Sequence, residues 1–415
     1  MAHSDAFTAA NKYPGASLSD TERQIDMISL RSYRLGRIQQ LMKELDYAGC
    51  VFSDPINIRY ATGTRNCQVF ALRHACRYVF VATEGPVVLF EMHGDHYVAD
   101  GIEIVDQVRA AVNWSFTASG SRVDERARRW AEEIADLVRV HGGGNRRVAF
   151  DKVNPAGVAA LETLGIDIVD GTALAERARC IKSAEEIACL TASIAVCEAG
   201  FTRMRDTLEA GIREVDLWSI LHETNIMLGG EYIETRMLTS GGRTNPWFQE
   251  ASSRVIRPGD LVACDADLIG PFGYFADMSR TFFCPPGTPS DEQRCLYNLS
   301  YEQIQHNVEL LSPGMSFREF SEKSWELPDR FVANRYTAVI HGAGLAGEYP
   351  FIAYPEDFSE GGYDGFIEEN MVLCVESYIG AEDGYEGVKL EELVLITADG
   401  AKPLSSFPYE EDLLR

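Results

Sequence analysis

Carboxylate side chains stand close together in apolar stretches of the second half of the chain. Asp265 and Asp267 are two positions apart in residues 262–269, and a strand directs residues i and i+2 to the same face. Two like charges in a buried strand are unfavourable unless a cation compensates them. The spacing therefore predicts a cation beside this pair.

A third acid, Asp277, lies beyond the turn-forming residues 270–273. If this turn joins two antiparallel strands, the third carboxylate lies directly opposite Asp265. The pattern is repeated downstream, where Glu376 and Glu391 are expected to be cross-strand neighbours in a second hairpin. The sequence thus predicts two acidic hairpins.

A histidine, His341, stands between the two predicted hairpins and is followed by Gly342 and Gly344. Any one of these acids alone is more simply interpreted as a strand-end charge with a basic partner. Five carboxylates and one imidazole in apolar strands or glycine turns instead favour a metal site. Oxygen ligands with one imidazole suit a pair of Mn, Fe, Co or Zn ions and exclude an all-thiolate site.

The elements that position these residues indicate an α+β domain. A capping box at Ser183 and Glu186 predicts a long helix to about Met204, followed by a helix over 214–228. The predicted strand pairs are 260–269 with 274–283 and 371–379 with 387–397. Two further helices are expected to begin at the boxes Ser290-x-x-Gln293 and Ser316-x-x-Glu319.

The first half of the chain indicates a smaller α/β layer. Strands are expected over 49–52, 78–82, 86–91 and 147–150, and helices over 30–45 and 124–140. We therefore predict an arm over 1–27, an N-terminal domain over 28–178 and a catalytic domain over 179–415.

Charge and cysteine content limit the classes of partner and compartment. The net charge of −25 disfavours nucleic acid and anionic membrane surfaces as partners, and no apolar run is expected to approach membrane-spanning length. The ten cysteines contain no Cys-x-x-Cys pair and are interpreted as buried thiols of a cytoplasmic protein.

The order Asp, Asp, His, Glu, Glu on such strands resembles the pita-bread metalloenzymes, which include creatinase, prolidase, aminopeptidase P and methionine aminopeptidase. The resemblance covers roughly residues 28 to 415. It is strongest to the dimethylsulfoniopropionate lyase branch, through residues 57–62, 229–236 and 243–250 and through Asp267, where peptidases usually carry glycine. It implies a pita-bread catalytic domain after a creatinase-type domain, and the metal ligands Asp265, Asp267, Asp277, His341, Glu376 and Glu391.

Three positions depart from the patterns of these enzymes. Peptidases of the superfamily carry a histidine at the position of Trp247, and a second histidine some seven residues beyond the metal-binding one, which this chain lacks. The lyase branch carries an aspartate base where this chain has Gly347. We therefore expect the adjacent Glu348 to act as the base, assisted by Tyr336, which matches a residue of the lyase pocket.

The resemblance implies a homodimeric, metal-dependent lyase acting on a small zwitterionic carboxylate. A base removes the proton α to a metal-bound carboxylate, and the β C–S bond breaks to give dimethyl sulfide and acrylate. Trp247 and Tyr336 are the expected substrate-binding residues, and Trp247 could pack against an onium group. The expected cofactors are two divalent or trivalent metal ions, iron by resemblance, with Mn, Zn or Co as alternatives.

Two alternatives stay open. One is a dinuclear metallohydrolase of the Xaa-Pro dipeptidase or creatinase type that cleaves a C–N bond in a small substrate. The other is a binding protein without activity, against which the six intact ligand positions argue.

Overall fold

The computed structural model describes residues 25–414, in two compact units formed by residues 26–179 and residues 180–415. Of the arm predicted over residues 1–27, residues 1–24 lie outside the described part of the chain. Each unit has its own cluster of buried apolar side chains.

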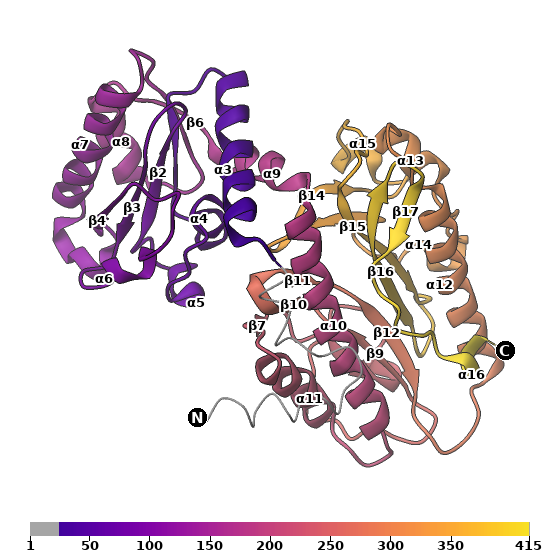
Figure 1. Cartoon of the computed structure of the whole chain (residues 1–415). Coiled ribbons are helices and arrows are strands. Elements are labelled where there is room, and N and C mark those ends of the chain that lie inside the picture. Colours follow the sequence, from indigo (N-terminus) through magenta and orange to yellow (C-terminus); the bar gives the residue numbers. More distant parts are fainter. Residues whose placement is uncertain (1–24, 415) are drawn as a thin grey trace. The chain divides into compact units, whose positions relative to one another are not determined.

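The unit of residues 26–179 is built on one six-stranded mixed sheet, drawn in indigo and purple in Figure 1. The strand order is β4-β3-β2-β1-β5-β6, and β1 pairs antiparallel with β2 but parallel with β5. These strands are β1 (Gly49–Phe52), β2 (Tyr78–Ala82), β3 (Val87–Glu91), β4 (Gln107–Ala110), β5 (Arg147–Phe150) and β6 (Asp167–Asp170).

Helix α7 (Val123–His141) supplies much of the apolar core of this unit. Its Trp130 is fully buried, stacks on Trp114 with ring centroids 4.1 Å apart, and meets Tyr78 of β2 edge-on. The other helices are α3 (Met27–Glu44), α4 (Pro55–Thr62), α5 (Gln68–Ala71), α6 (Phe116–Ser119), α8 (Pro155–Thr163) and α9 (Gly171–Cys180), with 3-10 turns at His96–Ala99 and Gly120–Arg122.

The unit of residues 180–415 contains two small three-stranded sheets and one five-stranded antiparallel sheet. The five-stranded sheet has the order β14-β13-β15-β16-β17 and holds the two long strands β15 (Val372–Ile379) and β16 (Val388–Thr397). The remaining strands of this sheet are β13 (Ile340–Ala343), β14 (Gly347–Ile352) and β17 (Gly400–Pro403).

The small sheets have the orders β11-β10-β7 and β12-β9-β8. The predicted antiparallel pairing of 260–269 with 274–283 is present, but each strand is interrupted and its two parts pair in different sheets. The parts are β7 (Tyr232–Ile233), β8 (Leu238–Ser240), β9 (Leu261–Asp265), β10 (Leu268–Ile269), β11 (Phe275–Ala276) and β12 (Ser279–Phe283), with 3-10 turns at Gly241–Arg243 and Pro271–Gly273.

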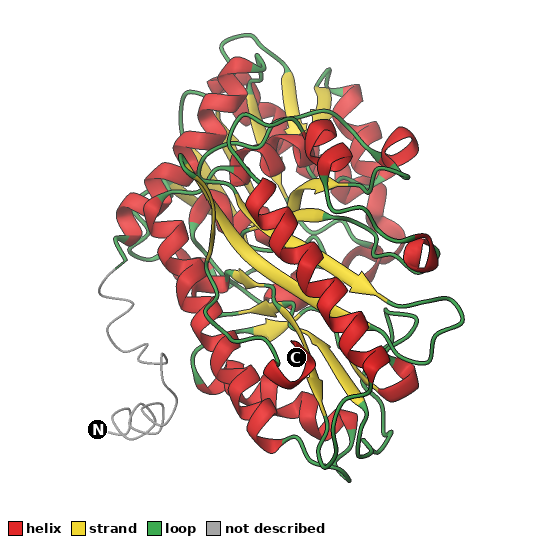
Figure 2. Cartoon of the chain, turned by 90° about the vertical axis from the view of Figure 1, so that its right-hand side faces the viewer, coloured by secondary structure: helices red, strands yellow, loops and turns green. Residues whose placement is uncertain are grey.

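Helices cover these sheets. Helix α12 (Asp291–Leu310) packs against β15 and β16, and Figure 2 shows a long helix crossing the long strands. Helices α10 (Ala184–Thr207) and α11 (Glu214–Met227) pack against each other. The shorter helices are α13 (Phe317–Lys323), α14 (Asp329–Val332), α15 (Phe358–Gly361) and α16 (Glu411–Leu414).

Helix α10 corrects one expectation from the sequence. It is long and apolar enough to cross a membrane by length and composition alone, contrary to the prediction that no run approaches that length. Because 61% of its most apolar window is buried inside the protein, it has the burial of a core helix.

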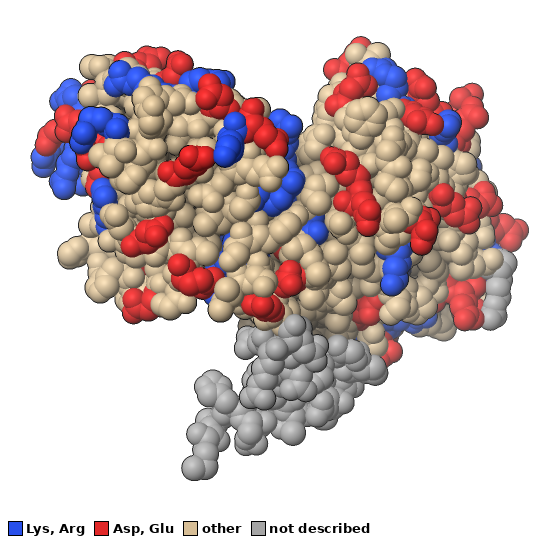
Figure 3. Space-filling view, turned by 45° about the horizontal axis from the view of Figure 1, so that its top comes forward, with Lys and Arg blue, Asp and Glu red and all other residues tan. Residues whose placement is uncertain are grey.

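Figure 3 shows acidic side chains spread over the visible faces of both units, with basic ones between them, in keeping with the negative net charge. Eight of the ten cysteines are buried as predicted, but Cys67 and Cys295 are exposed.

Candidate metal centre

One face of the five-stranded sheet carries a row of polar side chains. His341 of β13 pairs with Cys374 of β15, and Glu376 pairs with Glu391 of β16, as predicted for the second hairpin. Cross-strand partners and residues two apart share a face of the sheet, so these four side chains lie together. Cys374, Glu376 and Glu391 are almost fully buried.

The other acids come from the interrupted strands of the small sheets. Asp265 ends β9 and pairs with Ser279 of β12, so the prediction that Asp277 lies opposite Asp265 is wrong. The hairpin is centred on Phe272, which has a left-handed φ of 60° and widens the connection. The register is shifted by two residues, and Asp277 falls in the same break as Asp267.

Asp267 owes its direction to this break. Its φ of 41° is left-handed, a conformation that aspartate tolerates better than most residues. Thr235 donates a hydrogen bond to Oδ2 of Asp267, and Glu234 N donates one to its backbone carbonyl at 2.9 Å. The break therefore directs the Asp267 carboxylate toward the other acids, although Asp267 itself belongs to no strand.

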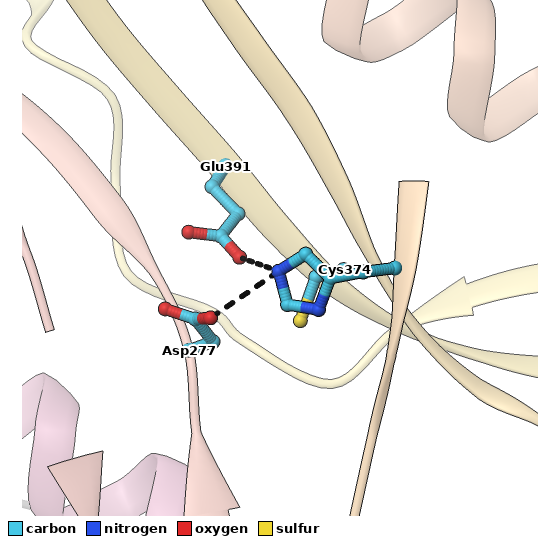
Figure 4. Close-up of side chains that lie close together, drawn as sticks. Asp277, Cys374 and Glu391 are labelled. Carbon is cyan, nitrogen blue, oxygen red and sulfur yellow. Dashed lines mark ion pairs between the residues drawn. The ribbon is translucent and has the colours of Figure 1, made fainter. Parts of the chain in front are cut away.

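The structure brings all six predicted ligands together. His341 Nε2 lies 3.2 Å from Glu376, 3.5 Å from Asp277 and 3.8 Å from Glu391. Oxygens of Asp265, Asp267 and Asp277 lie within 4.8 Å of one another. Figure 4 shows Asp277 and Glu391 directed at the same imidazole nitrogen.

A lysine that sequence reasoning missed lies among these acids. Lys389 is fully buried, and its Nζ lies 2.6 Å from Glu376, 2.7 Å from Ser279 Oγ and 3.4 Å from both Asp265 and Glu391. It stands two residues before Glu391 on β16, so the alternation of that strand could have indicated it. Lys389 compensates part of the carboxylate charge from within the chain.

Burial and mutual repulsion dominate the electrostatics of the cluster. Burial and the charge of Asp265 raise the pKa of Asp267 to about 7. Burial, together with Glu391 and Asp267, holds the pKa of Asp277 well above its usual range. Burial also opposes ionisation of Asp265, but Lys389 and the Ser279 hydroxyl outweigh it and lower the pKa of that carboxyl. The cluster thus carries more carboxylate than Lys389 can neutralise.

The donor set fits a metal ion. Asp277 Oδ1 and Glu391 Oε1 are buried without a hydrogen-bond partner, and such orphaned atoms are costly unless something occupies the space between them. His341 Nδ1 lies 3.0 Å from the carbonyl of Gly342, which leaves Nε2 facing the acids. Aspartate, glutamate and one histidine are suitable ligands for Mn, Fe, Co or Zn.

The residues expected to bind substrate lie in one aromatic cluster. Trp247 packs with Ala263 and Tyr378, and Tyr336 borders the same group. Lys389 Nζ lies 4.7 Å from the centre of the Tyr336 ring, which places Tyr336 beside the acids. The indole Nε1 of Trp247 is buried without a hydrogen-bond partner, so it is free to donate.

Glu348, the expected base, lies in a different setting. Its Oε1 accepts a hydrogen bond from Lys182 Nζ at 2.5 Å, in an ion pair whose two side chains are at most 1% exposed. Gly347 and Glu348 are neighbours on β14, so they face opposite sides of the strand. A Cβ added at Gly347 would lie 3.9 Å from His341 Nδ1. The face that turns toward His341 thus belongs to Gly347.

Comparison with known proteins agrees with this architecture. Residues 188–398 match the metallopeptidase family M24, and residues 34–181 match the creatinase/prolidase N-terminal domain. A solved Xaa-Pro dipeptidase from Bacillus anthracis has a TM-score of 0.73 at 20% identity, covering 91% of this chain and 98% of its own. Prolidase from Pyrococcus furiosus has a TM-score of 0.70 at 22% identity, covering 89% and 99%.

Two curated relatives resemble the chain over nearly its whole length. The dimethylsulfoniopropionate lyase DddP of Roseovarius nubinhibens is 36% identical over 96% of this chain and 90% of its own length. The enzyme of the same name from Roseobacter denitrificans is 34% identical over 94% and 88%. The chain therefore belongs to metallopeptidase family M24, the metal-dependent pita-bread enzymes, with a creatinase-type domain before the catalytic one.

Proposed function

We propose that this protein is a metal-dependent lyase that cleaves dimethylsulfoniopropionate into dimethyl sulfide and acrylate. The observation that carries the proposal is the 36% identity to a dimethylsulfoniopropionate lyase over 96% of the chain. The assembled cluster of five carboxylates and one histidine supports it, since a chain that had lost the activity would be expected to have lost ligands.

Two metal ions are the proposed cofactors, with iron first by resemblance and Mn, Zn or Co as alternatives. The residues that would hold them are Asp265, Asp267, Asp277, His341, Glu376 and Glu391. When bound, the metal supplies Lewis-acid polarisation of the substrate carboxylate, which acidifies the adjacent α-proton.

The aromatic cluster provides the rest of the substrate site. The indole face of Trp247 suits the sulfonium group, because an aromatic ring attracts a desolvated cation. Burial and the charge of Glu376 hold the pKa of Tyr336 well above its usual range, so its hydroxyl stays protonated and can donate a hydrogen bond. These contacts would orient a small zwitterion with its carboxylate toward the acids.

In the elimination, a base takes the α-proton, the C–S bond breaks, and dimethyl sulfide leaves with the electron pair. Glu348 remains the base predicted from sequence, but its buried ion pair with Lys182 favours a positioning role. Gly347 provides no side chain toward His341, so the identity of the base is a separate question from the reaction itself.

We further propose that the protein is a cytoplasmic homodimer. The proposal rests on the resemblance to the lyase branch and on the cysteine content, and sedimentation analysis of the purified chain tests the oligomeric state.

Headspace gas chromatography of metal-loaded protein with dimethylsulfoniopropionate tests the reaction. We expect dimethyl sulfide and acrylate in equal amounts, loss of both after chelation or in Asp265→Ala, and recovery of wild-type activity when metal is returned. The dipeptide Ala-Pro serves as the comparison substrate. Hydrolysis of that dipeptide without any dimethyl sulfide, by protein that holds metal, would reverse the assignment in favour of the hydrolase.

A further inference from the structure

The cluster contains two overlapping groups of possible ligands that differ in chemistry. One group, Asp265, Asp267 and Asp277, offers oxygen alone. The other group consists of Asp277, His341, Cys374 and Glu391, whose ligand atoms all lie within 4.8 Å of one another. Asp277 is common to both groups. The second group therefore offers oxygen, nitrogen and sulfur at one position.

The fold fixes the place of Cys374. It lies directly across the sheet from His341, two residues before Glu376 on β15 and on the same face. It is fully buried. Figure 4 shows its sulfur beside the imidazole toward which Asp277 and Glu391 point. A cysteine at this position is confined to the metal cluster by the register of three strands.

A second observation points to a ligand at the same place. Asp277 and Glu391 are at most 3% exposed, and each keeps one carboxylate oxygen without a hydrogen-bond partner. His341 directs Nε2 into the same space. Burial of unpaired oxygens beside an imidazole and a thiol is unfavourable in a protein core unless a cation binds between them.

We propose that Cys374 is a ligand of the metal ion at the His341 position, which makes that position a mixed sulfur, nitrogen and oxygen site beside an all-oxygen one. The inference deepens the proposed function and rests on its metal dependence, not on its substrate. As the S–metal bond forms, the thiol proton leaves to solvent and the sulfur binds as thiolate.

The thiolate sets the metal preference of this position. Sulfur favours Zn(II), Fe(II) and Co(II) over Mn(II) and Mg(II), whereas the all-oxygen position does not discriminate in this way. The two positions of the centre would therefore differ in the metals that they retain.

Cobalt spectroscopy tests the assignment without any substrate. Metal-free full-length protein is titrated with Co(II), and the near-ultraviolet sulfur-to-cobalt charge-transfer band is recorded for the wild type, Cys374→Ser and Cys264→Ser. Cys264 is the matched control, because it is also fully buried and adjoins Asp265, but it lies on β9 outside the mixed group.

We expect the band in the wild type and in Cys264→Ser, and its absence in Cys374→Ser. Loss of the sulfur ligand should also weaken Co(II) binding by at least about tenfold. A band of equal intensity in Cys374→Ser, or no band in wild type that holds two Co(II) per chain, would overturn the proposal. Neither result bears on dimethyl sulfide release, so the inference and the proposed function fail separately.

X-ray absorption on the wild type covers the case in which Cys374→Ser does not fold. With zinc bound, one sulfur scatterer at about 2.3 Å from the metal supports the assignment. A shell of nitrogen and oxygen alone overturns it.

Discussion

Gly347 is the residue at which the chain departs most from the lyase pattern. A Cβ added there would meet only ordinary contacts, 3.8 Å from the Phe275 ring and 3.9 Å from His341 Nδ1. The position therefore has room for a Cβ, and a side chain placed there would begin beside His341.

We predict that Gly347→Asp accelerates dimethyl sulfide release. A positioned base contributes about 10²-fold or more to proton abstraction, so we expect a gain of that order in kcat over the wild type. Headspace rates at saturating substrate measure it, and Gly347→Asn is the control because it has the same shape without a basic carboxylate. Equal rates for the Asp and Asn variants would mean that the chain already has a competent base.

The ion pair between Lys182 and Glu348 acts at the scale of elements. Lys182 precedes the N-cap of α10, and its backbone N–H bonds the carbonyl of Asn370 just before β15. Glu348 belongs to β14, whose partner β13 carries His341. The pair thus links the start of the unit of residues 180–415 to the hairpin that carries His341.

We predict that Glu348→Gln and Lys182→Met each lower the free energy of unfolding by roughly 3–5 kcal/mol, because each breaks a buried ion pair. The double variant Lys182→Met/Glu348→Leu should lose much less than the sum of the two. Denaturant unfolding measures these values. If Glu348→Gln instead keeps full stability and metal content but releases no dimethyl sulfide, Glu348 is the base.

Regular elements were predictable because their signals are local. The capping boxes at Ser183 and Ser290 are present as predicted, and the register of Glu376 with Glu391 is confirmed. The register around Asp265 was not predictable, because it depends on left-handed backbone at Asp267 and Phe272, where no glycine marks the conformation.

Two further buried side chains among the acids depend on how the strands pair. Lys389 and Cys374 occupy strands whose apolar neighbours indicate burial, but only the pairing of β13, β15 and β16 brings them to the acids. A buried thiol is common in cores, so Cys374 gave no signal until its cross-strand partner was known to be His341.

At the scale of the whole molecule, two separate cores indicate two cooperative units. The cluster around Trp130 belongs to residues 26–179, and the cluster around Leu373 belongs to the catalytic unit. The predicted ligands all belong to the catalytic unit, and a ligand stabilises only the state that binds it.

We predict two calorimetric unfolding transitions, of which only one moves when metal is added. Metal at about 100 times its Kd contributes about 2.7 kcal/mol. Each kcal/mol raises the Tm of a unit of this size by about 2–4 °C, so the expected rise is about 5–11 °C. Scans with and without chelator measure it. One transition that shifts as a whole would show that the units unfold together.

Lys389 supplies the acidic cluster with a positive charge that is part of the chain. Its ammonium contacts Glu376, Asp265 and Glu391, so part of their charge is offset by the chain itself. Unlike a zinc finger, whose fold is assembled by its ion, this unit has a means of folding first and acquiring metal afterwards. Stripping and reloading with different metals should therefore be reversible, and occupancy in the cell would follow metal supply rather than synthesis of the chain.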